Sequence, residues 1–322
     1  MKQNFLRVLV PFFALCLLAG CGTEKPGTTP ESAPADWPLR ISAILPHDDQ
    51  GYWTTLGAGI LERAGELEAD AKIVTPQLNY NISQMIELIR QATAAQVDAI
   101  IVQGIEDPDY LRALEDASDA GVQVVMVDTN VAETFPHLYV GTDNYAAGVQ
   151  LGRELIRETD GKAVVAVLTG AEGYPNLDAR LRGLQDVIKE QPGIEIRRVE
   201  YDEYDSLTVM EKYNLILRED PDVDTIVCVE GTGGQTFGRL LTPDTCPLKH
   251  LLGFDLSDET LMGLSSGLID GSLVQQQKEM GRMAVEELVR YFDEGAYRSM
   301  TLYTPTVYVT AQDLNEEGVY EG

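Results

Sequence analysis

Basic residues are scarce in this sequence. It contains 24 Lys and Arg residues against 52 Asp and Glu residues, so the formal net charge at neutral pH is −28. Removing residues 1–20 would also remove Lys2 and Arg7, which brings the charge to −28 − 2, or −30. This excess of negative charge excludes nucleic acid and anionic lipid surfaces as partners bound through charge.

Histidine and cysteine are also rare, with three and four copies. His47, His137 and His250 are scattered without metal-ligand spacing, so we expect no metal site. Cys228 and Cys246 are the cysteines outside the N-terminal region, and in an oxidising compartment they can pair. Cys228 lies in an apolar run, however, where a buried free thiol is common. The sequence leaves both states open.

Long apolar runs are lacking, and the one near the N-terminus is too short to span a bilayer. It extends from Val8 to Leu18 and follows the basic residues Lys2 and Arg7, as in an export signal. It ends in Leu18-Ala19-Gly20-Cys21, which resembles a bacterial lipobox whose cysteine is lipidated. We therefore expect a signal peptide at 1–20 and a protein held outside the cytoplasm by lipid on Cys21. The alternative is an ordinary buried segment with a chance cysteine.

Residues 21–38 lack the apolar side chains that a core requires. Thr23 to Trp37 is rich in Pro, Thr, Ser, Gly and Ala, which predicts a flexible linker between the lipid and the folded part. The remaining chain of about 285 residues exceeds one typical domain.

After residue 38, short apolar runs alternate with longer amphipathic stretches. Continuous apolar strands separated by helices predict parallel sheets covered on both faces. Two similar series of about ten strands in all indicate two doubly wound α/β lobes. The strands are expected at 41–45, 72–75, 99–102, 122–127, 163–168, 194–199, 225–229, 250–254 and 272–274. Helices are expected near 52–67, 81–95, 107–121, 146–157, 179–189, 207–218, from 235, 259–264 and 280–292.

In such sheets, ligands bind beyond the carboxyl ends of the strands. Carboxylates and amides there can pair with hydroxyls, an arginine supplies a charge-assisted donor, and aromatic rings can cover the C–H faces of a sugar. A lone Asp after a strand is often a helix cap, and an aromatic pair that opens a helix is often core. The recurrence of these types at seven strand ends favours a site for a polyhydroxylated ligand.

Six short motifs occur in order over this region. They are Tyr52-Trp53, Val127-Asp128, Val140-Gly141-Thr142-Asp143-Asn144 followed by Ala147-Gly148, Ala179-Arg180-Leu181-Arg182-Gly183, Gly253-Phe254-Asp255, and Val274-Gln275 followed by Gly281. Together they make residues 39–312 resemble the periplasmic sugar-binding proteins of the ribose/galactose type, which share their core with LacI-type repressors. The export signal and the lack of a basic head exclude a repressor.

The resemblance implies an N-terminal lobe of 39–142 plus 276–303 and a C-terminal lobe of 143–275 plus 304–322. Three hinge segments, near 141–144, 275 and 303–306, would join them. It also implies a set of ligand-binding residues: Gln50, Tyr52, Trp53, Asp128, Thr129, Arg180, Tyr204, Thr232 (or Glu230), Asp255 and Gln275.

The sequence departs from the family pattern at three places. Thr129 stands where an arginine is common, Thr232-Gly233 stands where Asn-Asp is common, and Pro46 replaces a side chain that often donates a hydrogen bond. Lost hydrogen-bonding groups lower affinity for the ligand that used them. Ribose itself is therefore disfavoured, and pentose versus hexose stays open.

Catalytic patterns are weak. Gly263-Leu264-Ser265-Ser266-Gly267 has hydrolase spacing but ends a predicted helix, whereas a nucleophile elbow must open one. Gly231 to Gly234 lacks the remaining residues of a dinucleotide or phosphate loop. We therefore expect a monomeric binding protein without enzymatic activity or cofactor. It would deliver a sugar to a membrane permease or, alternatively, report it to a membrane histidine kinase or chemoreceptor.

Overall fold

The computed structural model describes residues 38–47, 51–78, 80–131 and 135–320. Two six-stranded sheets organise this part of the chain. The strands of the first are all parallel, in the order β11-β5-β4-β3-β1-β2. Their bounds are β1 Arg40–Ile44, β2 Asp70–Val74, β3 Ala99–Gln103, β4 Gln123–Val127, β5 Leu138–Thr142 and β11 Thr301–Thr304.

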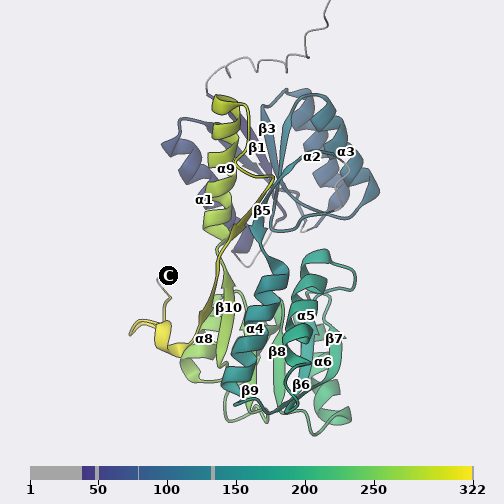
Figure 1. The fold of residues 1–322 in the computed structure, drawn as a ribbon, viewed down its shortest axis with the longest axis vertical. Helices are drawn as coiled ribbons and strands as arrows, with labels where there is room; N and C mark the ends of the chain where they lie inside the picture. The colour runs from purple at the N-terminus through teal and green to yellow at the C-terminus, as the bar shows by residue number, and fades with distance from the viewer. Residues whose placement is uncertain (1–37, 48–50, 79, 132–134, 321–322) are drawn as a thin grey trace, which may run out of the picture. The chain divides into compact units, whose positions relative to one another are not determined.

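Helices cover both faces of this first sheet, which explains why its central strands are apolar throughout. All five residues of β3 are buried. Figure 1 shows α1 (Tyr52–Glu66) and α9 (Gln277–Glu294) together on one side of the strands, and α2 (Ile82–Ala94) and α3 (Pro108–Asp119) on the other. Asn81 and Asp107 cap α2 and α3 through their side chains, a role that Asn and Asp favour at helix N-termini.

The second sheet has the order β12-β10-β9-β8-β6-β7. Its strands are β6 Ala163–Thr169, β7 Ile194–Tyr201, β8 Thr225–Cys228, β9 His250–Phe254, β10 Gly271–Gln275 and β12 Thr306–Val309. One face packs on α4 (Asn144–Glu158) and α5 (Pro175–Ile188), and the other on α6 (Ser206–Glu219), α7 (Gly231–Leu240) and α8 (Asp258–Ser266). A short 3-10 helix, η1, follows at Ala311–Asp313.

The prediction of fully parallel sheets is wrong for one strand, because β12 pairs antiparallel with β10. β11 and β12 are separated by Pro305 alone, so β12 runs straight on into the second sheet without a helical crossover. Parallel strands need such a crossover of a dozen residues or more. The two strands, like β5, were not among the predicted strands.

The chain passes between the two sheets three times. The passages follow β5 at Thr142–Asn144, β10 at Gln275–Gln277 and β11 at Thr304–Thr306. A side-chain bond joins the first two, because the Thr142 hydroxyl donates to Gln275 Oε1 at 2.7 Å. The predicted α/β fold with two parallel-sheet lobes is therefore confirmed.

Helices α5 and α7 each begin four residues earlier than the sequence pattern predicts. The expected starts are 179 and 235, whereas α5 begins at Pro175 and α7 at Gly231. Glu230 caps α7: its carboxylate accepts from the backbone N–H groups of Thr232 at 2.7 Å and Gly233 at 3.0 Å. The glycine-rich run Gly231 to Gly234 reads as a loop by propensity, and the cap overrides that weak preference.

Cys228 is buried and Cys246 half-buried, and both are free thiols in the structure. No helix in the described ranges is both long and apolar enough to cross a membrane. The predicted signal peptide, Cys21 and nearly all of the linker lie outside the described residues.

Candidate functional site

A cavity of about 730 Å³ is lined by side chains that follow strands of both sheets. This volume lies within the range of small-molecule sites. The first sheet contributes Tyr52, Trp53, Tyr80, Gln103 and Asp128, and the second contributes Tyr174, Asn176, Arg180, Tyr204, Glu230, Thr232, Asp255 and Gln275 among others. The carboxyl ends of both sheets therefore meet at one cavity.

Asp128 follows β4 with φ 65°, in the left-handed region that Asp tolerates better than most residues. Its N–H donates to Val140 O at 3.2 Å, and its own carbonyl accepts from the Tyr139 hydroxyl at 2.8 Å. The carboxylate is 5% exposed and accepts from three side chains: Tyr52 (2.6 Å), Gln103 (3.0 Å) and Thr129 (2.6 Å). These bonds hold the carboxylate in one orientation at the cavity wall.

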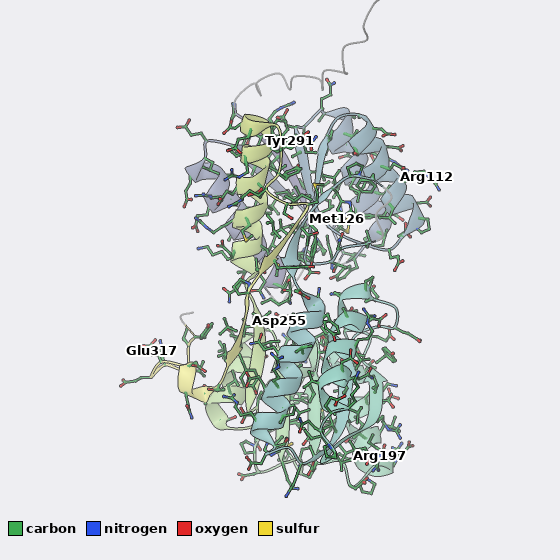
Figure 2. The ribbon with its side chains drawn as sticks, viewed as in Figure 1. Arg112, Met126, Arg197, Asp255, Tyr291 and Glu317 are labelled. Carbon is green, nitrogen blue, oxygen red and sulfur yellow. The ribbon has the colours of Figure 1, made fainter. Side chains whose placement is uncertain are left out.

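Asp255 repeats this arrangement after β9. Its φ is 58°, its N–H donates to Leu273 O at 2.8 Å, and its carbonyl accepts from the Ser272 hydroxyl at 2.6 Å. Gln275 Nε2 donates to both carboxylate oxygens at 3.1 Å. Figure 2 shows Asp255 at the end of its sheet near the crossing segments, with Arg197 toward the opposite end. Each lobe thus directs one oriented carboxylate into the cavity.

Arg180 lies on α5 with 2% of its surface exposed. Its guanidinium donates to Asn144 Oδ1 (2.8 Å), Val229 O (3.0 Å) and Gln275 Oε1 (3.0 Å), and lies 3.9 Å from the centre of the Phe254 ring. Helix α4 packs tightly here: a Cβ on Gly148 would come within 2.0 Å of Arg180 O. Arg180 is therefore fixed by residues at two of the three crossing segments.

Burial raises the pKa of Asp255 to about 6, although Arg180 and the Gln275 hydrogen bond act to lower it. Because this folded pKa lies above the value of about 4 in an unfolded chain, the group makes the ligand-free protein less stable as pH rises from about 4 to 6. A ligand hydroxyl would donate a stronger hydrogen bond to the ionised carboxylate of Asp255 than to the neutral acid, so such a ligand would stabilise the ionised form. We expect ligand affinity to fall as pH decreases below about 6. Calorimetric titrations between pH 5 and 7.5 measure this.

The matched control for that pH dependence is Asp255→Asn. Asparagine tolerates the same left-handed backbone and does not titrate. The variant should bind more weakly at neutral pH and lose the acid-side decline. A wild-type affinity that stays flat from pH 7.5 to 5 would contradict the role given to Asp255.

Aromatic rings line the rest of the cavity. Tyr52 and Trp53 meet edge to face with ring centres 5.0 Å apart, and Trp53 is 6% exposed. Tyr174 and Tyr204 also meet edge to face, at 5.7 Å, and remain about 40% exposed. The first pair packs into the core beside the cavity, whereas the second leaves ring surface open at the mouth.

The structure brings most of the predicted site residues together. The cavity is lined by Tyr52, Trp53, Asp128, Arg180, Tyr204, Thr232, Asp255 and Gln275, and also by Glu230, the alternative to Thr232. Gln50 lies outside the described residues. Thr129 differs from the expectation: it is buried behind Asp128, donates to its Oδ2 at 2.6 Å and does not line the cavity. Thr129 therefore positions Asp128 and makes no direct contact with the cavity.

Several lining residues were not predicted: Tyr80, Gln103, Tyr174, Asn176, Gln235 and Gln277. Gln103 is the last residue of β3, so the same strand-end rule identifies it. Tyr80 and Tyr174 lie in loops several residues beyond their strands, where sequence position alone gives no signal. The described residues contain no group of acidic, histidine and cysteine side chains that could hold a metal ion.

Comparison with known proteins gives consistent results. A family model described as "Periplasmic binding protein domain" matches residues 41–296. The ribose import binding protein RbsB of Bacillus subtilis is 24% identical over 279 residues, which cover 85% of this chain and 88% of that protein. A D-apiose import binding protein of Actinobacillus succinogenes is 23% identical over 258 residues, covering 80% and 83%.

Solved structures are similar over nearly their full length. The glucose-galactose binding protein GanP of Geobacillus stearothermophilus has a TM-score of 0.79 and 29% identity, covering 86% of this chain and 98% of its own. An ABC transporter solute binding protein of Burkholderia graminis, in complex with D-arabinose, has a TM-score of 0.79 and 24% identity, covering 87% and 97%. The latter likeness concerns the fold.

Proposed function

The chain belongs to the periplasmic binding protein family, and from this premise we propose that it captures a monosaccharide outside the cytoplasm and delivers it to an ABC-type sugar permease. The observation that carries the proposal is the cavity of about 730 Å³ into which both lobes direct an oriented carboxylate. Two buried carboxylates, an arginine and amide side chains pair directionally with hydroxyls. Relatives named for ribose, D-apiose and glucose-galactose support this ligand class.

The lobes of this proposal are 39–142 plus 276–303 and 143–275 plus 304–322. Support comes from the strands, since β1 to β5 and β11 share one sheet and β6 to β10 and β12 share the other. The lobes would close over the ligand by a hinge at the three crossing segments. Closure is driven only by contacts that the ligand makes better in the closed form. Asp128 from one lobe and Asp255 from the other would supply them.

The ligand-binding residues of the proposal are Tyr52, Trp53, Asp128, Arg180, Tyr204, Thr232, Asp255 and Gln275, with Gln50 as a further contact and Thr129 behind Asp128. Trp53 and Tyr52 would cover a C–H face of the sugar ring. Thr129 supplies no positive charge beside Asp128. Among the described lining residues, Arg180 is therefore the guanidinium that a ligand can contact. This disfavours ribose itself and leaves pentoses and hexoses as candidates.

A thermal-shift screen over pentoses, hexoses, polyols and nucleosides tests the proposal. A ligand that binds the folded state raises the melting temperature. We expect at least one monosaccharide to do so and to change the intrinsic fluorescence, because Trp53 lines the cavity. Trp37 is the other tryptophan of the chain, so a Trp37→Phe background isolates the signal of Trp53. A melting temperature unmoved by every sugar would refute the proposal.

We also propose that the protein is anchored outside the cytoplasm by lipid on Cys21, after removal of residues 1–20. The lipobox-like run before Cys21 supports this. We expect Cys21→Ala to release the protein from membranes into the soluble fraction. Cell fractionation and immunoblotting measure this release. Cys246→Ala, which changes a half-buried cysteine of the folded part, is the control and should remain with the membrane. Membrane retention of Cys21→Ala would contradict the anchor.

The protein is proposed to act as a monomer, without cofactor and without enzymatic activity. The family takes its name from binding, which supports a role in capture rather than chemistry. Reporting the sugar to a membrane sensor would use the same closed form. Co-purification of the ligand-loaded protein with a permease rather than a sensor distinguishes delivery from reporting.

A further inference from the structure

The charges that line the cavity are unbalanced. Its described lining contains a single guanidinium, Arg180, and no lysine. Against it are five carboxyl groups, those of Asp128, Glu230, Asp255, Asp258 and Glu259. All three kinds of Arg180 nitrogen already donate to protein acceptors, so its hydrogen bonds are largely committed. A ligand with negative charge would meet a surplus of negative charge at close range, where the dielectric is low.

Two acidic residues, Glu230 and Asp202, lie together at one wall of the cavity. Glu230 is 4% exposed, and its two oxygens accept from the N–H groups of Thr232 and Gly233. Asp202 lies behind it, fully buried, with Oδ1 accepting from Tyr204 N at 3.0 Å. Burial raises the pKa of Asp202 well above its ordinary value, and the charge of Glu230 raises it further. Asp202 therefore favours its protonated form, and Glu230 is the member of the pair that lines the cavity.

Capping alone does not require this arrangement. Ser, Thr, Asp or Asn at this position would satisfy the first N–H groups of α7 without a second buried acid behind them. Keeping a buried carboxylate beside another acid is costly unless a positive partner compensates it.

Unpartnered acceptors give an independent sign of what the cavity binds. Gln103 is 5% exposed, and its Nε2 donates to Asp128, which fixes the orientation of the amide. Its Oε1 is buried without a partner, and so is Oδ1 of Asn176. Both residues line the cavity. A buried acceptor without a donor costs free energy. Because one such acceptor comes from each lobe, a ligand rich in N–H and O–H donors would fit the cavity.

Tyr174 and Tyr204 add a third feature that favours positive charge. They lie next to each other at the mouth, about 40% exposed, and Tyr80 lines the cavity from the other lobe. The face of a tyrosine ring attracts cations. The exposed parts of these rings can therefore contact a cation in the cavity.

We propose that the ligand of this cavity is an amino sugar, a monosaccharide with a free protonated amine, whose ammonium binds Glu230 while its hydroxyls bind Asp128 and Asp255. This inference rests on the proposed function of monosaccharide capture. An ammonium carries three donors and a full positive charge, which matches both the carboxylate surplus and the unpartnered acceptors. A phosphorylated or carboxylated sugar also supplies hydroxyl donors, but it would bring negative charge to a lining that already has a surplus of it.

Isothermal titration calorimetry on the full folded protein tests the charge of the ligand. Glucosamine, galactosamine and mannosamine are each compared with the neutral parent sugar and with the N-acetylated derivative, in which the amine is uncharged. For the stereochemistry that fits, the free amine should bind about tenfold to a hundredfold tighter than either comparison sugar, the range expected of one charge-assisted hydrogen bond.

Glu230→Gln identifies the receiving group. Glutamine keeps one acceptor for the cap and removes the charge, so the preference for the free amine should fall to near one. Glu190→Gln is the matched control: it removes one charge in the exposed turn after α5 of the same lobe, outside the cavity lining, and should retain the preference. If Glu230→Gln fails to fold, the wild-type ratios still decide the proposal.

The outcomes separate the two proposals. Neutral sugars that bind as tightly as their amino forms, or more tightly, overturn the amino-sugar inference and leave sugar capture standing. An equal loss of preference in both variants overturns the role of Glu230. No binding by any sugar of this set overturns the amino-sugar inference, and no response to any sugar of the thermal-shift screen overturns the proposed function as well.

Discussion

Asp128→Ala is expected to lose at least a hundredfold in ligand affinity, the largest effect of any single change at the cavity. The carboxylate accepts from Tyr52, Gln103 and Thr129, so its removal leaves three buried donors without their acceptor. Each stranded donor costs about 1–3 kcal/mol when it stays buried. The ligand also loses a charged acceptor that the rest of the first lobe holds in position. Calorimetry with the best sugar of the thermal-shift screen measures the loss.

The backbone at this position requires its own control. Asp128 has φ 65°, and alanine in the left-handed region costs about 1 kcal/mol of stability by itself. Asp160 has φ 49° at the exposed end of α4, away from the cavity, so Asp160→Ala carries the same backbone penalty. It should bind normally. Asparagine adopts the left-handed backbone conformation readily, so Asp128→Asn removes the charge alone. This variant should also bind the sugar weakly. Wild-type affinity in Asp128→Asn would refute the role of the charge.

Arg180→Ala is expected to lose ligand affinity to an extent comparable with Asp128→Ala. Unlike Asp128→Asn, it should also lose much of the free energy of unfolding. The side chain is 2% exposed and satisfies Asn144, Val229 and Gln275. Its loss removes the donor to Asn144 Oδ1 and Val229 O, leaves Gln275 Oε1 with the Thr142 hydroxyl as its donor, and empties the space above Phe254. We expect the free energy of unfolding to fall by about 2–4 kcal/mol. Denaturant unfolding without ligand measures this part separately from binding.

The matched control is Arg182→Ala on the same helix, two residues further along and exposed. It removes an equal charge and should change neither binding nor stability appreciably. A second readout is Asp255, whose pKa Arg180 lowers. Without Arg180, the pH at which Asp255 titrates, followed by carboxyl NMR, should rise above about 6. An unchanged titration in Arg180→Ala would show that the two groups do not interact as the geometry indicates.

The predictable part of the fold was the part set by local pattern. The predicted strand at 250–254 coincides with β9, and the predicted strand at 99–102 differs from β3 by one residue. The sequence pattern missed β11 and β12, which have one buried residue each, and also β5, which is fully buried. The places of β11 and β12 are decided by pairing with β5 and β10, which are far away in the sequence.

The candidate site divides in the same way. Asp128, Asp255 and Gln275 were predictable because each ends or follows a strand, and the carboxyl ends of parallel strands meet at one edge. Thr129 shows the limit of that rule: one residue further along the chain, the side chain turns behind Asp128 and no longer lines the cavity. Strand-end position places a backbone near the cavity but does not fix where the side chain points.

The sequence by itself determined the two-lobed α/β architecture and most of the residue types at the cavity, because burial periodicity and strand ends are local properties. Only the tertiary structure decided that Asp202 lies behind Glu230, that Arg180 binds Gln275, and that Gln103 leaves an acceptor without a partner. These relations join residues 20 to 100 positions apart, and they depend on how helices and strands pack. The balance of charge in the cavity is therefore a property of the packed molecule and cannot be read from neighbouring residues in the sequence.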